Sequence, residues 1–430
     1  MQTATHRAPG LVLTDHQFLV PVDHDDPAGE SLTVFAREAV APRRERDALP
    51  WLVFFQGGPG FESPRPLARV QIWMERALKD WRVLLLDQRG TGRSTPINGR
   101  TLAERGSPER QAEYLTHFRA DSIVRDAEHI RRQLLGDDEQ WDVAGQSYGG
   151  FCITTYLSLA PEGIRQAFVM GGLPPLSASP DDVYRALYPR VLEKNRLYFE
   201  RYPEDRGRLA AVIEQLDAGS VTLPGGDRLT PERLQCLGIV FGMHDGFERV
   251  HYLLEEAFFE DSDRPRFSDR FLYDAEAATG FYANPLYAAL HEPIYCQGTA
   301  AGWAAQRVRD EFPAFDPSSA EPVFTGEMIF PWMFEQQAAL RPLQEAAELL
   351  AQRSDWPGLY DPARLGQSRA RSAAVIYHDD MYVDAIASQA TARAIAGMRP
   401  WITNQYQHDG GYEDGERLFD RLVNMASGEV

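Results

Sequence analysis

The stretch WDVAGQSYGG, residues 141–150, places a serine between an apolar run and a glycine-rich segment. Residues 141–144 are predicted to form a short buried strand, and residues 148–159 an apolar helix. Ser147 then lies in the turn between them, within the pattern G-x-S-x-G. Small residues two positions on either side allow a sharp strand-to-helix turn that exposes the serine hydroxyl. The stretch therefore predicts a nucleophilic serine on an α/β sheet, although a glycine-rich turn with a solvent-facing serine has the same pattern.

The segments on both sides of this stretch alternate between strand and helix patterns. Continuous apolar runs at Trp51–Phe55 and Val83–Leu86 are typical of strands buried on both faces, as in a parallel sheet. The alternation predicts an α/β sheet built from right-handed crossovers. The other predicted elements are strands at 32–40 (of antiparallel type), 167–170, 373–377 and 401–406, and helices at 70–79, 122–135 and 386–395.

After Pro174 the alternation of strand and helix patterns gives way to mostly helical patterns, which indicates an insertion in this domain. Residues 181–215 and 332–353 are helix-rich, and the part between them is irregular and rich in proline. Sheet patterns return only near Ala373. We therefore expect a catalytic domain made of residues 1–174 and 366–430, interrupted by a helical cap of residues 175–365.

Composition and charge exclude several classes of protein. The 430 residues contain 44 Lys and Arg against 63 Asp and Glu, a net charge of −19, which disfavours nucleic acid as a partner. No stretch approaches the ~18 apolar residues of a membrane helix, and residues 1–12 lack a signal-peptide pattern, so we expect a cytoplasmic protein. The three cysteines, Cys152, Cys236 and Cys296, form no CxxC pair that would indicate a zinc site or disulfides. Cys152 falls inside a predicted helix, which favours packing over a nucleophilic role.

The segment Gln56-Gly57-Gly58-Pro59-Gly60 follows a predicted strand and is a candidate oxyanion loop. Glycine lets a backbone N–H approach a ligand without an intervening side chain. In a hydrolase, the N–H groups of Gly58 and Tyr148 would bind the developing negative charge. A plain structural turn is the alternative; a phosphate loop is disfavoured because the G-K-[ST] ending and the G-x-G-x-x-G pattern are both missing.

A nucleophilic serine needs a histidine as base and an acid that orients it. In α/β-hydrolase order the acid and then the histidine follow the serine. His408, on a glycine-rich loop after the predicted last strand, is the first candidate, and His378 is the second. The acid should follow strand 373–377, where spacing alone leaves Asp379, Asp380 and Asp384 open.

Three motifs together resemble the proline iminopeptidases of the α/β-hydrolase superfamily, in their longer bacterial form. They are Gly57-Gly58-Pro59-Gly60, the segment DQRGTGRS at residues 87–94, and Gly145-Gln146-Ser147-Tyr148-Gly149-Gly150. The resemblance covers nearly the whole chain and implies an α/β-hydrolase fold with a mostly parallel central sheet and a helical cap. Most relatives have His before the double glycine where this chain has Gln56, a difference that leaves the backbone donors intact.

The resemblance also assigns site residues. The family places its acid directly before a methionine, which matches Asp380 in front of Met381, and its histidine matches His408. Glutamates of the cap bind the charged N-terminal amine of the substrate in this family, and Glu292 and Glu327 look similar to them. A buried ammonium needs a carboxylate partner, so the role is physically reasonable. A solvated or helix-capping acid is the alternative for each glutamate.

The expected function is a serine exopeptidase that releases N-terminal proline from peptides through an acyl-enzyme, with no metal or organic cofactor. The expected partners are peptides, and we expect no binding to nucleic acid or to a membrane. The alternatives are a broader aminopeptidase or an esterase on the same fold, and a hydrolase-like binding protein with an inactive site. Epoxide hydrolases are disfavoured because residue 147 is serine. Four aromatic residues of the cap could either wall a pyrrolidine pocket or belong to the core: Tyr295, Phe330, Trp332 and Phe334.

Overall fold

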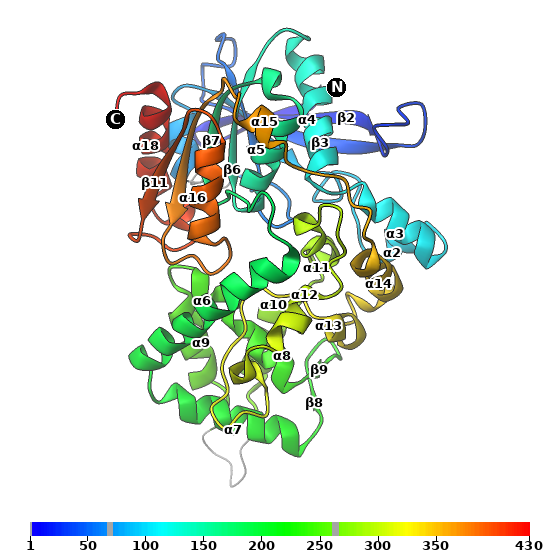
Figure 1. Ribbon diagram of the computed structural model, residues 1–430, viewed down its shortest axis with the longest axis vertical. Helices are drawn as coiled ribbons and strands as arrows, with labels where there is room; N and C mark the ends of the chain where they lie inside the picture. The colour runs from blue at the N-terminus through cyan, green and yellow to red at the C-terminus, as the bar shows by residue number, and fades with distance from the viewer. Residues whose placement is uncertain (1, 67–71, 260–265) are drawn as a thin grey trace.

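The centre of the fold is a nine-stranded sheet, in a computed structural model that describes residues 2–66, 72–259 and 266–430 (Figure 1). The strand order is β1-β2-β3-β5-β4-β6-β7-β10-β11. The six strands from β5 to β11 in this order are parallel, and β1, β2 and β3 join them in antiparallel pairs. The strands are β1 Gln2–Ala8, β2 Leu11–Pro21, β3 Ser31–Val40, β4 Trp51–Phe55, β5 Arg82–Asp87, β6 Trp141–Gln146, β7 Ile164–Met170, β10 Arg371–Tyr377 and β11 Met398–Thr403.

Apolar side chains cover both faces of the sheet, because alternate residues of a strand point to opposite sides. Val53 and Phe55 belong to one core with α4 and α5, whereas Leu52 and Phe54 belong to a second core with α1 and α18. The helices of this part are α1 Ile72–Ala77, α2 Gly99–Ala103, α3 Pro108–Thr116, α4 Ala120–Leu135, α5 Tyr148–Leu159, α16 Ala385–Ala394, α17 Gly410–Glu413 and α18 Gly415–Ser427.

Helices dominate the chain between β7 and β10. Those from α6 to α14 lie below the carboxyl ends of the parallel strands in Figure 1, whereas α15 lies beside α5. Two short strands, β8 Val221–Thr222 and β9 Arg228–Leu229, form a separate pair there. The helices are α6 Pro180–Arg201, α7 Asp205–Ala218, α8 Pro231–Gln235, α9 Gly246–Glu255, α10 Asp269–Thr279, α11 Pro285–Leu290, α12 Ala304–Arg309, α13 Pro331–Gln336, α14 Gln344–Gln352 and α15 Pro362–Leu365. Short 3₁₀ helices in the same region include η2 Cys236–Gly242.

The sequence predictions agree with the sheet except at the edge strand β11 and at the two strands β1 and β2 of the other end. The last strand was expected at 401–406 but lies at 398–403, because it is a half-exposed edge strand that tolerates Pro400 and lacks a long apolar run. The sequence did not indicate β1 and β2; β1 is the opposite edge and consists largely of polar residues. The helix expected at 70–79 appears at Ile72–Ala77, and residues 70 and 71 lie outside the described residues.

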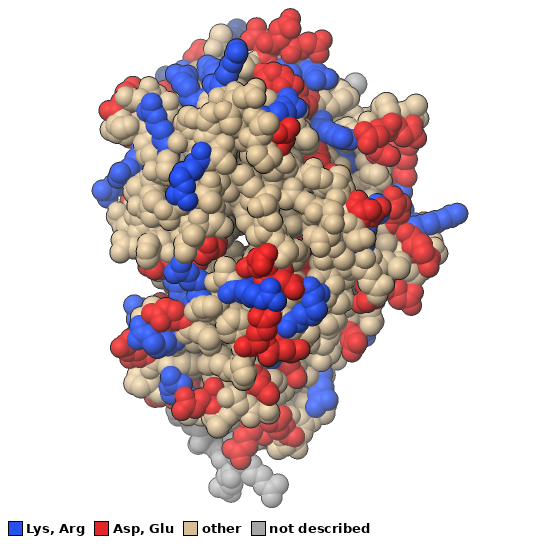
Figure 2. Space-filling model, in the orientation of Figure 1, with Lys and Arg blue, Asp and Glu red and all other residues tan. Residues whose placement is uncertain are grey.

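The charged side chains are spread over the visible face of the molecule. Figure 2 shows Asp and Glu on both the sheet part and the helical part, interleaved with Lys and Arg. The excess of acidic groups is therefore distributed over this face and not gathered at one place. Among the described residues, no helix combines the length and the hydropathy needed to span a bilayer.

Candidate active site

Ser147 occupies a strained turn between β6 and α5. Its backbone has φ 53° and ψ −125°, a conformation that residues other than glycine rarely adopt. A Cβ on Gly145 would lie 2.5 Å from the carbonyl carbon of Gly149, and a Cβ on Gly149 only 2.0 Å from the carbonyl oxygen of Phe55. The backbone packs so closely here that only glycine fits at both positions. The turn therefore holds the serine at the carboxyl end of β6.

His408 and Asp380 lie together on the loops that follow β11 and β10. The Nδ1 atom of His408 is 2.6 Å from Oδ2 of Asp380. The other carboxylate oxygen accepts the backbone N–H groups of Tyr382, at 2.8 Å, and Val383, at 3.1 Å. Both side chains are almost completely buried. Since each oxygen of Asp380 has a donor, the carboxylate is fixed in place and in turn orients the imidazole.

A cavity of about 510 Å³ joins this pair to the serine. Ser147 and His408 both line it, with Gly57 and Gly58 of the glycine-rich loop beside them. A Cβ on Gly57 would lie 3.1 Å from the Ser147 Cβ, so this loop passes directly against the serine. Tyr148 is the first residue of α5, where backbone N–H groups lack acceptors inside the helix. The folded chain thus brings together residues that are far apart in sequence.

The segment DQRGTGRS, residues 87–94, supports the glycine-rich loop from behind. The Asp87 carboxylate accepts the N–H of Ser63 at 3.1 Å and two hydrogen bonds from Arg65 at 2.8 and 2.6 Å. Gln88 donates to the backbone carbonyl of Gln56 at 3.1 Å. This segment therefore anchors the chain on both sides of Gly58 without lining the cavity itself.

Glu327 places a carboxylate in the same cavity. Its Oε1 accepts a hydrogen bond of 2.8 Å from the hydroxyl of Tyr287, a buried residue that also lines the cavity. The sequence did not single out Tyr287 as a site residue, although it precedes Glu292 by five positions. A partly buried carboxylate that faces such a cavity is suited to bind a cationic group.

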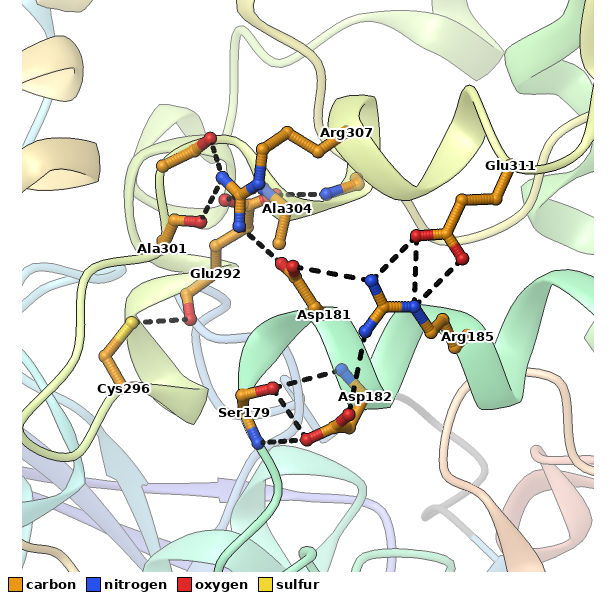
Figure 3. A network of polar contacts seen from close by, with 12 residues as sticks. Ser179, Asp181, Asp182, Arg185, Glu292, Cys296, Ala301, Ala304, Arg307 and Glu311 are labelled. Carbon is orange, nitrogen blue, oxygen red and sulfur yellow. Dashed lines mark hydrogen bonds and ion pairs between the residues drawn. The ribbon is translucent and has the colours of Figure 1, made fainter.

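Glu292, the other glutamate assigned from the resemblance, lies elsewhere. Its carboxylate accepts the backbone N–H groups of Ala304, at 3.0 Å, and Ala305, at 2.8 Å, at the beginning of α12. Figure 3 shows this carboxylate beside Arg307, which bonds Asp181 and the carbonyl of Ala301. Burial raises the pKa of Glu292 to about 7, although the two amides oppose the shift. The alternative reading of this residue, a helix-capping acid, agrees with these contacts.

The other residues that the sequence offered as base, acid or nucleophile make different contacts in the structure. His378 is exposed and pairs with the equally exposed Asp379 at 2.8 Å. Asp384 caps α16 by accepting the N–H groups of Ile386 and Ala387. Cys152 is fully buried, and this burial raises the pKa of its thiol.

The aromatic wall of the cavity differs from the suggested set. The four suggested residues Tyr295, Phe330, Trp332 and Phe334 are not among the described residues that line the cavity, and all but Trp332 are buried in the core. The aromatic residues that do line it are Phe61, Phe281, Tyr287, Tyr382 and Tyr412. The sequence could not identify them because they come from four separate segments, around residues 61, 281–287, 382 and 412, that meet only in the folded chain.

The charge of the imidazole depends on its neighbours. Burial by itself would lower the pKa of His408, but the Asp380 carboxylate, and to a smaller extent Glu327 and Asp409, raise it above the ordinary value of 6.5. A carboxylate at hydrogen-bonding distance stabilises the imidazolium that forms when the base takes up a proton.

Two groups of residues have the composition of a metal site. They are Glu204, Asp205 and His251, and separately His244, Asp245 and Asp409; within each group the potential ligand atoms lie within 4.8 Å of one another. In both groups the histidine already contacts an aspartate, His251 with Asp205 at 2.9 Å and His244 with Asp409 at 2.6 Å. Neither group is among the residues that line the cavity of Ser147, as far as the structure describes the chain.

Comparisons with known proteins agree with this architecture. Residues 50–208 match the family model for the alpha/beta hydrolase fold. The chain is 48% identical over 418 residues to the proline iminopeptidase of Aeromonas sobria, covering 97% of both chains. It is 37% identical over 414 residues to the proline iminopeptidase aneH of Aspergillus aculeatus, covering 94% of this chain and 92% of the relative. The crystal structure of a proline iminopeptidase from Mycobacterium smegmatis aligns with a TM-score of 0.43 and 15% identity, over 96% of this chain and 100% of that one.

The mostly parallel sheet, the serine turn after β6 and the family match define an α/β-hydrolase. Within this class, two relatives above 30% identity match nearly the whole chain. The chain belongs to the proline iminopeptidase family.

Proposed function

We propose that this protein is a serine exopeptidase that releases N-terminal proline from peptides. The observation that carries the proposal is a single cavity lined by a hydroxyl, an imidazole and a carboxylate, those of Ser147, His408 and Glu327. The relatives' name, proline iminopeptidase, supports the substrate class. We further propose that residues 175–365 form a cap domain on a catalytic domain of residues 1–174 and 366–430. The three free cysteines are consistent with a cytoplasmic location.

In the proposed mechanism, the Ser147 hydroxyl attacks the carbonyl carbon of the N-terminal residue while His408 takes the hydroxyl proton on Nε2. Asp380 accepts the Nδ1–H bond, holds the tautomer and stabilises the imidazolium. The N–H groups of Gly58 and Tyr148 bind the oxyanion, a contribution of about 3–4 kcal/mol for each such donor. The imidazolium then returns its proton to the leaving amine, and the C–N bond breaks. Water, activated by the same imidazole, hydrolyses the acyl-enzyme and releases the amino acid.

Glu327 is the proposed anchor for the protonated imino group of the substrate. The pairing of the charges offsets the cost of bringing the ammonium out of water. It also limits the reaction to the first peptide bond, because the main-chain nitrogen is cationic only in the terminal residue. An ester substrate would not need this carboxylate, so Glu327 favours a peptidase over the esterase alternative.

The substrate class is tested with chromogenic amides of proline, alanine and N-acetylproline. We expect the prolyl amide to be the best substrate, by about tenfold or more in kcat/KM over the alanyl amide, since small apolar differences are worth ~1–3 kcal/mol. The N-acetylated amide should not be hydrolysed, because it has no charge for Glu327. Equal rates for the prolyl and alanyl amides would remove the assignment to proline while leaving the hydrolase.

Replacing Glu327 by glutamine should raise KM for the prolyl amide by about 10- to 100-fold. The reason is the loss of a charge-assisted hydrogen bond, worth ~1.5–3 kcal/mol. The matched control is Glu292→Gln, which changes the buried cap of α12 and should lower the melting temperature with KM close to that of the native enzyme. Steady-state kinetics and thermal unfolding measure both. A similar rise in KM for the two variants would instead restore Glu292 as a second anchor.

A further inference from the structure

The loop that carries His408 is bound on one side by the cap. The backbone N–H of His408 donates to the carbonyl of Gly242, the last residue of η2, at 3.0 Å. One residue earlier, Gln407 accepts a hydrogen bond of 2.5 Å from Nζ of Lys194, which belongs to α6. Two separate elements of the cap therefore contact the proposed catalytic base and the residue before it.

Asp409, the residue after His408, makes the most specific of these contacts. Its Oδ1 accepts the backbone N–H of His244 at 3.0 Å, and its Oδ2 lies 2.6 Å from Nδ1 of the same residue. The carbonyl of Asp409 also accepts the N–H of Tyr412 at 2.8 Å. The hydrogen bond to Asp409 raises the pKa of His244 although burial opposes the rise. Asp409 is thus bound to the cap and to α17 at the same time.

Close packing adds to these hydrogen bonds. The hydroxyl of Tyr382 donates to the carbonyl of Ile239, and its ring lies against the His408 ring with centroids 4.7 Å apart. A Cβ on Gly242 would lie 2.2 Å from the Tyr382 ring. Residues 239–244, which we call the clamp segment, therefore contact both Tyr382, which packs on the imidazole, and the loop of residues 407–409.

The clamp segment also forms part of the substrate cavity. Ile239 and Met243 line it together with Ser147 and Glu327. The segment thus lines the cavity through Ile239 and Met243, and it holds the loop of His408 through Gly242 and His244. A shift of the segment would therefore alter both the wall of the cavity and the support of the base.

We propose that the clamp segment is a positioning device for catalysis, in which the pair of His244 and Asp409 keeps His408 at the correct distance from Ser147. This inference rests on the role of His408 given under the proposed function. Its consequence is that the base is fully aligned only while the cap is in place. A displacement of about 1 Å at a reacting group can reduce the rate ~100-fold.

The test is the variant His244→Ala, assayed with the prolyl amide. We expect kcat to fall by about 10- to 100-fold while KM changes much less, because the amine anchor Glu327 is untouched. The rate at which a fluorophosphonate labels Ser147 should fall in parallel, since labelling needs the same base and does not need the anchor. The variant His244→Asn should recover most of the loss, because its side-chain amide presents a donor at the position of Nδ1.

The matched control is His378→Ala. His378 also contacts a neighbouring aspartate through Nδ1, at 2.8 Å, and it lies two residues before Asp380, but it is exposed and is not part of the clamp. This variant should keep the kcat and the labelling rate of the native enzyme. Because the side chain of His244 is 43% exposed, the variants His244→Ala and His244→Asn should both fold.

Three results would overturn the proposal. The first is a normal kcat and labelling rate in His244→Ala, and the second is a change in KM alone. The third is inactivation of the native enzyme by a chelator with recovery on adding Zn²⁺, which would make His244, Asp245 and Asp409 a metal site. Failure of the proposed function is recognised separately, because the native enzyme would then not be labelled at Ser147.

Discussion

Replacing Ser147 by alanine is expected to lower kcat for the prolyl amide by about 10⁶-fold, the order seen when a catalytic serine is removed. The acyl-enzyme cannot form without the hydroxyl of Ser147, and Cys236 provides the one thiol among the described residues that line the cavity. The thiol of Cys236 is a poor substitute, since burial raises its pKa to about 11. Steady-state kinetics give the loss in rate.

Mass spectrometry after treatment with a fluorophosphonate is the control for this variant. The native protein should gain one adduct on Ser147, and Ser147→Ala should gain none. Its melting temperature should stay close to the native value, because alanine keeps the Cβ and the strained backbone of the turn unchanged. More than a hundredth of the native activity in the variant would require a different nucleophile.

Replacing Asp380 by asparagine should lower kcat by about 10⁴-fold. Asparagine can keep the acceptor for the N–H groups of Tyr382 and Val383, so the loop should remain folded. Its amide would donate to Nδ1 of His408 and leave the proton on Nε2, where the imidazole can no longer accept one from Ser147.

The pH profile of kcat/KM in the native enzyme also tests the influence of Asp380 on the protonation of His408. In the native enzyme the acid limb should lie above 6.5, because activity needs neutral His408 and Asp380 raises its pKa.

The matched control for Asp380 is its neighbour, Asp379→Asn. Asp379 is about half exposed and contacts only the exposed His378 among the described hydrogen bonds. We expect this variant to keep native kinetics and the native pH profile. A large loss in Asp379→Asn with a mild effect of Asp380→Asn would reverse the assignment of the acid.

Local patterns were sufficient to predict the parallel strands and the helices next to them. Helix α5 was predicted with the observed ends, and β4 likewise, because apolar runs bounded by glycine and polar residues identify buried elements directly. The edge strands β1, whose described side chains are mostly exposed, and β11, which is half-exposed, lack such runs. Their pairing is determined by the neighbouring strand, which a local pattern does not include.

The order of serine, acid and histidine along the chain, and the glycines that surround Ser147, could be derived from the sequence alone. A sharp turn requires glycine wherever another backbone passes, and this requirement acts over a few residues. Three features could not be derived in this way. They are the choice between neighbouring aspartates by spacing, the different surroundings of Glu327 and Glu292, and the aromatic wall of the cavity. These features depend on contacts between separate segments, such as Asp380 with His408, 28 residues apart, and Tyr287 with Glu327, 40 residues apart, and such contacts exist only in the folded chain.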